Sequence, residues 1–359
     1  MYARGGALFA VPFDLKRLAV TGSETPVIEG LYYDGAGGGF ADYAFSNFGL
    51  LVYATRAQGS NPHTLEWLDR AGNRQPLPAP PQEYLGMRLS PDGRSAALDY
   101  GSSRGAYDIW NYVFARGSGA GQRLTSQGAN IHPVWTRDGL RVAFQAGAAP
   151  QTGGIDSVSA NAGGKPESLI SGVEAVPDSL TQDGKTLFYT QRVGSRSHIF
   201  AAKLAGGGSS ESRPQPLLDN SAFNESDAQV SRDGHWVAYT SDDSGKNQVY
   251  MRPFPGPGGV VPVSIEGGQE PRWSHDEKEL FYRDAIKGEL MVVGIQTSPA
   301  FRVGMPQALF ELRTAVWDVA PDGQRFLAVK KGETTARETK LRVVDNWFDE
   351  LRRKVRTGK

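Results

Sequence analysis

The turn Ser231-Arg232-Asp233-Gly234 decides the fold, because six similar turns recur along the chain. Most copies read Ser/Thr-x-Asp-Gly, where x varies; one copy ends in Glu277, and the first is the worn Phe45-Ser46-Asn47-Phe48. The marker residues lie between 43 (233 to 276) and 50 (183 to 233) residues apart, at Asn47, Asp92, Asp138, Asp183, Asp233, Asp276 and Asp322. A period of this length is typical of repeat architectures.

Each repeat contains four short β-type runs. In the copy around Asp233 these runs are 229–231, 236–239, 248–251 and 260–263, separated by turn-forming residues. Asp-Gly suits a tight hairpin, because Gly accepts a positive φ and Asp bonds the nearby backbone. Four antiparallel strands per repeat make a propeller blade. The sequence therefore predicts an all-β, seven-bladed β-propeller with four-stranded antiparallel blades, with six or eight blades left open.

The two ends of the chain predict how the ring closes. Residues 7–13 resemble the third strand of the repeat at 289–295, whereas the last repeat lacks a clear fourth strand. An N-terminal strand that completes the last blade would remove exposed edges. We therefore expect a single propeller domain over 1–345, followed at 346–359 by a short helix and basic tail docked on the propeller. At Glu277 a positive φ would be costly, so we expect that turn to change type.

Composition narrows the class of protein. The chain of 359 residues has 39 basic and 39 acidic side chains, a formal charge of zero, which argues against general nucleic-acid binding. The absence of Cys excludes disulfides and thiolate chemistry. No apolar run approaches the ~20 residues of a membrane span, and residues 1–20 do not read as a signal peptide. We expect a monomer, cytoplasmic unless the chain is a fragment of a membrane protein.

Several segments spread over the chain resemble a known family. They are 6–14, 65–72, 107–110, 250–259, 279–282 and 346–348. These segments resemble the WD-like repeats of TolB-type propellers, and more closely the C-terminal propeller that follows the kinase domain in many bacterial Ser/Thr protein kinases. The kinase motifs themselves are absent from the chain. The resemblance implies a non-catalytic sensory module, extracytoplasmic if it belongs to a membrane kinase.

Polar residues just before each innermost strand are the candidate site. They are expected to meet at one end of the central channel: Asp42, His132, Asp178, Glu225, Asp227, Glu270 and Asp318. Such a rim suits a small-molecule or protein ligand. No cofactor is expected apart from a divalent cation, for which His132, Glu225, Asp227 and Glu270 would be the ligands. The plain alternative is a set of solvated loop carboxylates.

We expect several other polar and aromatic residues to have a structural role and no part in a binding site. The Asp-Gly turns are interpreted as scaffold, and the remaining histidines (His63, His198, His235 and His275) as surface residues. Trp135 and Trp273 share one repeat position, and we expect them to wedge between blades.

These observations favour a non-catalytic binding module of the sensor type. One alternative is a metal-dependent propeller enzyme, a lyase or hydrolase acting on a sugar acid or lactone. Another is a structural scaffold for protein interactions. The chain lacks the Gly-x-Ser-x-Gly and His-Glu-x-x-His motifs of serine hydrolases and zinc proteases.

Overall fold

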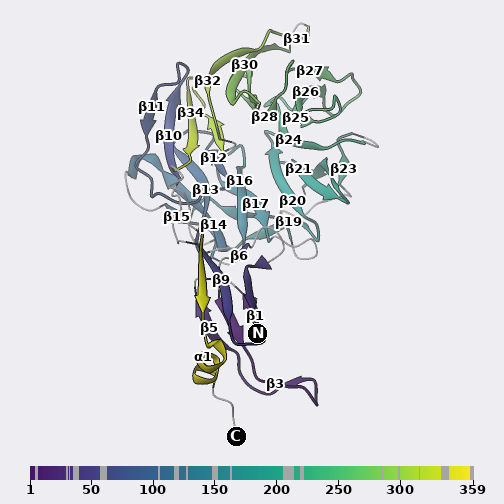
Figure 1. The fold of residues 1–359 in the computed structure, drawn as a ribbon. Helices are drawn as coiled ribbons and strands as arrows, with labels where there is room; N and C mark the ends of the chain where they lie inside the picture. Colours follow the sequence, from purple (N-terminus) through teal and green to yellow (C-terminus); the bar gives the residue numbers. More distant parts are fainter. Residues whose placement is uncertain are drawn as a thin grey trace. The chain divides into compact units, whose positions relative to one another are not determined.

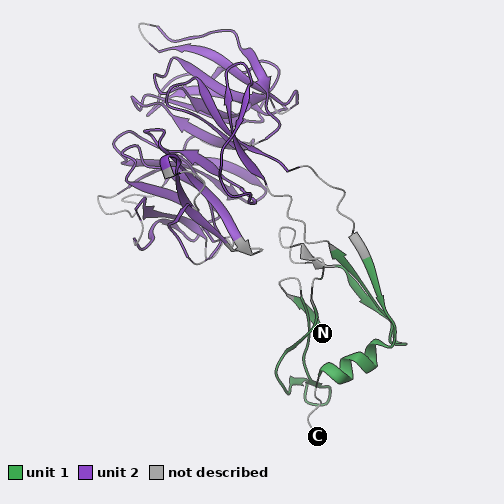
Figure 2. Cartoon of the chain, turned by 90° about the vertical axis from the view of Figure 1, so that its left-hand side faces the viewer, with its two compact units in different colours: residues 1–62, 333–359 green, residues 63–332 purple. Residues whose placement is uncertain are grey.

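The computed structural model divides the chain into two compact units, coloured separately in Figure 2. Unit 1 comprises 1–62 and 333–359, and unit 2 comprises 63–332. The structure describes residues 1–4, 7–29, 31, 33–34, 40–56, 63–103, 106–116, 121–126, 128–147, 153–161, 164–204, 214–218, 222–284, 286–297, 300–314, 316–332 and 339–355. The expected single domain over 1–345 thus differs from this division, and the repeat marked at Asn47 lies in unit 1.

Unit 2 consists of antiparallel sheets, five of which are each built by one repeat in the order of the chain (Figure 1). The first is β12 (Met87–Leu89), β13 (Ser95–Ser103), β14 (Ala106–Val113) and β15 (Gln122–Arg123), with a 3₁₀ turn at Phe114–Arg116. The second is β16 (Asn130–Trp135), β17 (Arg141–Ala146), β18 (Gly154–Ser159) and β19 (Glu167–Ser171). The third is β20 (Ala175–Leu180), β21 (Thr186–Val193), β22 (Arg196–Lys203) and β23 (Gln215–Pro216).

Two further sheets continue the same pattern. The fourth is β24 (Glu225–Val230), β25 (Trp236–Ser241), β26 (Gln248–Pro253) and β27 (Val261–Pro262). The fifth is β28 (Gln269–Trp273), β29 (Glu279–Asp284), β30 (Glu289–Gln296) and β31 (Arg302–Val303), with β32 (Gln307–Glu311) also paired to β30. The short spacing between strands follows from the turn residues noted in the sequence.

The sixth sheet joins two distant parts of the chain. Its strands are β33 (Trp317–Val319), β34 (Arg325–Lys330), β10 (Thr64–Asp69) and β11 (Arg74–Pro76). Strand β10 pairs with β34 from Thr64 opposite Lys330 to Asp69 opposite Arg325. The expectation that residues 7–13 complete the last sheet is therefore wrong. Leu65 and Leu68 of β10 are fully buried in this sheet, so burial of their side chains favours the observed pairing.

The first strands of the six sheets, β12, β16, β20, β24, β28 and β33, contact one another in sequence. Strand β33 also contacts β12, so each first strand has a first strand on either side. Apolar clusters fill the space between neighbouring sheets; in one of them Phe188 of the third sheet packs with Val230 and Tyr239 of the fourth. The core of unit 2 is therefore a series of intersheet layers.

The repeated turns are built as the sequence predicts. In the turn at 136–139, the Thr136 hydroxyl donates to Asp138 at 2.6 Å, and Asp138 accepts the Leu140 amide at 2.9 Å. Gly139 has a φ of 70° and donates its amide to the Thr136 carbonyl. The Thr136 bond, together with the backbone bonds, lowers the pKa of Asp138. The hydroxyl, the carboxylate and the glycine amide of the turn thus find partners locally.

The turn with Glu277 in place of Gly keeps the same geometry. Glu277 has a φ of 60°, and its amide donates to the Ser274 carbonyl at 3.0 Å, as the glycine does in the other copies. The expected change of turn type is therefore wrong. The backbone accepts a left-handed conformation that costs roughly 1–2 kcal/mol for a non-Gly residue.

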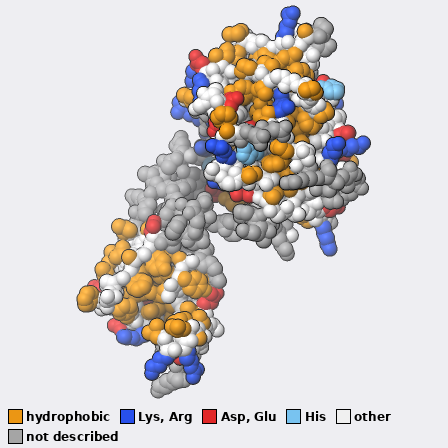
Figure 3. Space-filling view, turned by 90° about the vertical axis from the view of Figure 1, so that its right-hand side faces the viewer, with side chains coloured by type: hydrophobic (Ala, Val, Ile, Leu, Met, Phe, Trp, Pro, Cys, Tyr) orange, Lys and Arg blue, Asp and Glu red, His pale blue; other side chains and the backbone are white. Residues whose placement is uncertain are grey.

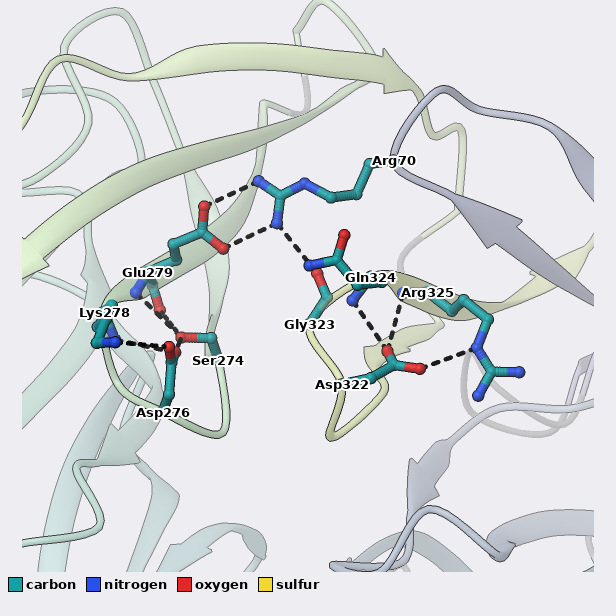
Figure 4. A network of polar contacts seen from close by, with 9 residues as sticks. All are labelled: Arg70, Ser274, Asp276, Lys278, Glu279, Asp322, Gly323, Gln324 and Arg325. Atoms are coloured by element: carbon teal, nitrogen blue, oxygen red, sulfur yellow. Dashed lines mark hydrogen bonds and ion pairs between the residues drawn. The ribbon is translucent and has the colours of Figure 1, made fainter.

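Figure 4 shows how one arginine ties the sixth sheet to the fifth. Arg70, which follows β10, donates two 2.8 Å bonds to the carboxylate of Glu279, the first residue of β29. It also donates to the Gly323 carbonyl at 3.0 Å. Because Arg70 comes from the early part of the chain, these contacts help hold β10 against β34.

Unit 1 is a smaller all-β unit with one helix. Its sheets are β1 (Tyr2–Arg4), β2 (Ala7–Ala10) and β5 (Thr25–Glu29); β3 (Phe13–Asp14) and β4 (Ala19–Val20); β6 (Tyr33–Asp34) and β7 (Phe40–Ala41); and β8 (Tyr43–Phe45), β9 (Leu51–Arg56) and β35 (Thr339–Val344). The predicted C-terminal helix is present as α1 (Trp347–Lys354). Its Trp347 is fully buried with Leu8 and Leu51, so the helix packs on unit 1 itself. Residues 356–359 of the basic tail lie outside the described residues.

The surface agrees with the balanced composition. On the face drawn in Figure 3, acidic and basic side chains lie interspersed among hydrophobic ones. Among the residues that the structure describes, no helix combines the length and apolar character that crossing a membrane requires.

Candidate functional site

Unit 2 contains a cavity of about 530 Å³ where the first strands end and the repeated turns begin. The x residue of each Ser/Thr-x-Asp-Gly-type turn lines it: Pro91, Arg137, Gln182, Arg232, His275 and Pro321. A cavity of this size suits a small organic ligand. The turns were interpreted as scaffold, but their variable position forms the cavity wall.

A second repeat position also lines the cavity. It lies four residues before each marker, and its six members all line the cavity: Arg88, Val134, Ser179, Gln229, Arg272 and Asp318. Each of these residues is on a first strand, β12 through β33. Because neighbouring first strands contact one another, residues at one repeat position come together from all six sheets.

Four arginines line the cavity: Arg88, Arg137, Arg232 and Arg272. Arg272 is 4% exposed and Arg88 lies on the neighbouring part of the lining. Burial, and then the nearby charge of Arg272, lower the pKa of Arg88 to about 10. Burial also lowers the pKa of Arg137, whose guanidinium donates to the Leu180 and Val230 carbonyls at 3.3 and 3.1 Å. Closely spaced buried cations repel one another, and each lacks the stabilisation that water would give.

Five acidic residues line the same cavity: Asp92, Asp138, Asp178, Glu277 and Asp318. Burial, followed by the charge of Asp227, raises the pKa of Asp178 well above its ordinary value. Burial likewise raises the pKa of Glu277 at the turn end of the cavity. A raised pKa makes a carboxyl easier to neutralise, so these groups compensate the arginines less than their number implies.

Three of the predicted rim residues lie in strained β-bulges. His132, Asp227 and Glu270 have φ values of 55°, 60° and 59°, and each lies where the register with the second strand shifts. A fourth shift places Asp178 in the equivalent part of β20. Non-Gly residues pay roughly 1–2 kcal/mol for this backbone conformation. These residues were expected just before the innermost strands; the structure has them within the first strands, at the bulges.

The rim carboxylates are held by one position of the second strands, seven residues after the marker. Thr190 donates to Asp178 at 2.8 Å, and Thr240 donates to Asp227 at 3.0 Å. Arg283 donates twice to Glu270, at 3.0 and 2.7 Å.

Glu270 and His132 of the rim make further hydrogen bonds to neighbouring side chains. The indole of Trp317 adds a 3.0 Å bond to Glu270. The His132 amide donates to Asp99, also seven residues after a marker, at 2.8 Å. The rim is thus an interlocked polar layer.

The remaining predicted residues have different surroundings. Asp318 accepts the Leu89 amide at 2.8 Å and lines the cavity with Asp178, whereas Glu225 is 1% exposed at the start of β24 and is not among the lining residues. Asp42 belongs to unit 1 and is exposed. Across the described residues, no group of three or more His, Asp or Glu side chains has an arrangement that could hold a metal ion.

The two equivalent tryptophans lie between sheets, as predicted. Trp135 donates its indole N–H to the Arg88 carbonyl, and Trp273 donates to the Gln229 carbonyl, each at 3.0 Å. Both rings also line the cavity. They supply apolar surface beside the arginines.

The sequence reasoning missed the arginines because it followed the acidic residues. Arg88 and Arg272 share the repeat position of Asp318, which was noted, and Arg137 and Arg232 occupy the x position of the quoted turns. The signal was therefore present at fixed repeat positions. His275 is exposed, as expected, yet it also lines the cavity and contacts Arg232 at 2.8 Å.

Comparisons with known proteins show which fold the chain resembles. No family model and no curated protein sequence matches the chain. Among solved structures, the chain is similar to a putative TolB from Agrobacterium tumefaciens, with a TM-score of 0.59 and 16% identity, covering 76% of this chain and 99% of that one. It is also similar to TolB from Acinetobacter baumannii, with a TM-score of 0.53 and 19% identity, covering 75% of this chain and 66% of that one.

The expected structural resemblance to TolB-type propellers is thus confirmed at the level of the fold. The protein is all-β, with several four-stranded antiparallel sheets, consistent with a β-propeller.

Proposed function

We propose that unit 2 is a six-bladed β-propeller closed by β10. The support is the cycle of contacts among the six first strands, together with the pairing of β10 with β34. Closure of this kind leaves no unpaired edge in the sixth sheet next to β34. The blade count differs from the seven expected because the repeat at Asn47 pairs its strand β9 with β35 in unit 1.

We propose that this propeller is a non-catalytic module that binds a small ligand in the cavity at the turn end. One observation carries the proposal: all six variable turn residues and all six residues four positions before the markers line a single cavity. A rigid ring with variable loop residues around one cavity is a common way to build a binding site.

A thermal-shift screen tests this proposal. A library of small acids, bases and neutral metabolites is added to the full chain and to the Gln182→Trp variant, which places a large side chain at an exposed cavity position. Lys185→Trp, in the same turn but outside the cavity lining, is the matched control. We expect compounds that raise the melting temperature of the wild type and of Lys185→Trp, but not of Gln182→Trp. If no compound behaves in this way, the proposal fails.

A sensory role linked to a bacterial kinase remains a finer proposal, supported by the segments quoted from the sequence. Its test is the DNA immediately upstream of the codon for Met1. An in-frame kinase domain and membrane span would support it, and an unrelated reading frame would contradict it.

A further inference from the structure

We propose that the cavity binds the oxyanion group of a small acidic compound, a carboxylate or phosphate, between Arg88, Arg137 and Arg272. This inference rests on the proposed ligand-binding function and names the chemistry of its ligand.

Arg272 has hydrogen-bonding capacity that the surrounding protein does not use. Its Nη1 donates to the Pro271 carbonyl at 2.7 Å, but its buried Nε has no hydrogen-bond partner. The nearest carboxylate, Asp318, lies 3.8 Å from that Nε. Both Asp318 oxygens already accept backbone amides, from Leu89 at 2.8 Å and Val319 at 3.0 Å. A buried N–H of a charged group without a partner is costly, so a ligand acceptor here would be stabilising.

In the part of the chain that the structure describes, the guanidinium groups of Arg88 and Arg137 donate hydrogen bonds only to neutral acceptors. Arg88 donates to the Met87 carbonyl at 2.9 Å, and Arg137 donates to the carbonyls noted above. Among the described residues, neither forms an ion pair within 4.0 Å. Carbonyl oxygens satisfy N–H groups but do not neutralise a positive charge.

Arg283, in the same unit, is an arginine whose charge and hydrogen-bond donors are matched by a carboxylate. Its fork makes two bonds to the Glu270 carboxylate, with both side chains 12% exposed. The guanidinium fork matches carboxylate and phosphate oxygens in the same way. An oxyanion in the cavity would give Arg88 and Arg137 the counter-charge that Arg283 already has, and would give Arg272 the acceptor that its Nε lacks.

The rest of the cavity fits an acidic organic molecule better than a bare ion. Trp135 and Trp273 line it with apolar ring surface, and about 530 Å³ exceeds what one oxyanion fills. Of the five acidic lining residues, Asp178 and Glu277 have pKa values raised by burial and would tolerate a nearby negative charge better than ordinary carboxylates.

Isothermal titration calorimetry of the full chain tests the inference with three probes: succinate, glycerol phosphate and succinamide. Succinamide keeps the shape of succinate but carries no charge. We expect one of the two anions to bind at least tenfold more tightly than succinamide, and more weakly as salt rises. Preference for succinate would identify a carboxylate ligand, and preference for glycerol phosphate a phosphate ligand.

Substitution of single arginines then tests where in the cavity the anion binds. Arg272→Gln and Arg88→Gln are each expected to weaken binding of that anion at least tenfold. Arg196→Gln, an exposed arginine of the same unit, is expected to change it less than twofold. Circular dichroism melting shows whether each variant folds. If one arginine variant does not fold, the affinity of the other arginine variant for the anion tests the inference.

Two outcomes would overturn the inference: succinamide binding as tightly as both anions, or anion binding unchanged in both arginine variants. Failure of the proposed function looks different, because then no compound in the thermal-shift screen depends on Gln182. If cavity-dependent compounds are found but all are neutral or cationic, only the oxyanion inference fails.

Discussion

Arg272 and Asp318 are paired but not hydrogen-bonded: the Nε of Arg272 lies 3.8 Å from Oδ1 of Asp318. The two residues occupy the same repeat position on adjacent first strands, β28 and β33. Two backbone amides donate to the Asp318 carboxylate and hold it in place. In this position the carboxylate attracts the Arg272 guanidinium but accepts no hydrogen bond from its Nε. The cavity therefore presents a buried guanidinium that still has a donor to offer.

Glu277→Gln should raise the affinity for the anion identified above by about threefold to tenfold. The change removes a carboxyl from the cavity lining while keeping the size of the side chain and the turn backbone. Coulomb repulsion between the ligand and a partly screened carboxylate is of this order. Glu311→Gln, an exposed acid outside the lining, is the control. Equal or weaker binding in Glu277→Gln would show that Glu277 does not face the ligand's charge.

His132 should make the free energy of unfolding depend on pH in the acid range. Burial, and then the charge of Arg88, lower the pKa of His132 to about 4, against about 6.5 in an unfolded chain. The stability from the neutral ring is thus complete above pH 6.5 and is lost as pH falls through 4, with a slope of up to about 1.4 kcal/mol per pH unit.

The variant His132→Asn removes this titration, and Asn tolerates the positive φ of 55°. Urea unfolding between pH 4 and 7 should give a flatter curve for the variant than for the wild type. Parallel curves would contradict the lowered pKa of the imidazole.

The Arg70–Glu279 pair should show a measurable coupling energy. A double-mutant cycle with Arg70→Met and Glu279→Gln should give about 1 kcal/mol, because the bonds are bidentate and both side chains are about one-third exposed or less. The Lys278–Asp276 pair, with side chains 81% and 58% exposed, is the matched control and should give close to zero. Equal coupling in the two cycles would argue against the bridge drawn in Figure 4.

Leu68→Ala should loosen β34, whereas Leu8→Ala should not. Leu68 of β10 is fully buried with Trp317 and Phe326 of the sixth sheet, and its truncation should cost about 2–5 kcal/mol. Leu8 of β2 is equally buried, but in unit 1. Hydrogen exchange of the β34 peptide measures the effect locally. Loss of protection in Leu8→Ala, with none in Leu68→Ala, would support closure by the N-terminal strand after all.

Much of the fold was predictable because its signals are local. The Asp-Gly turns and the alternating runs located the strands of unit 2, and the helix at Trp347 was expected. The closing strand was not predictable in this way, because residues 7–10 and 65–68 are both short runs rich in apolar side chains. Only the three-dimensional pairing of β10 with β34 distinguishes them.

The sequence pointed to the rim residues, whereas the cavity of the structure is lined mainly by others. His132, Asp227 and Glu270 were proposed from their shared repeat position, and in the structure the two carboxylates accept hydrogen bonds from neighbouring side chains. The cavity lies instead at the x residues, which vary from copy to copy. A repeat is recognised by the residues that recur, whereas the chemistry of this cavity depends on residues that differ, such as Arg137 and Pro91.

The most direct measurement is a crystal structure of the full chain grown with the tightest-binding anion. Our account predicts density for its oxyanion group within hydrogen-bonding distance of Arg272 Nε and of the Arg88 or Arg137 guanidinium, between the first strands and the repeated turns. Density for the anion only at the rim of His132 and Asp227, or only on the outer surface while the cavity holds none, would contradict it.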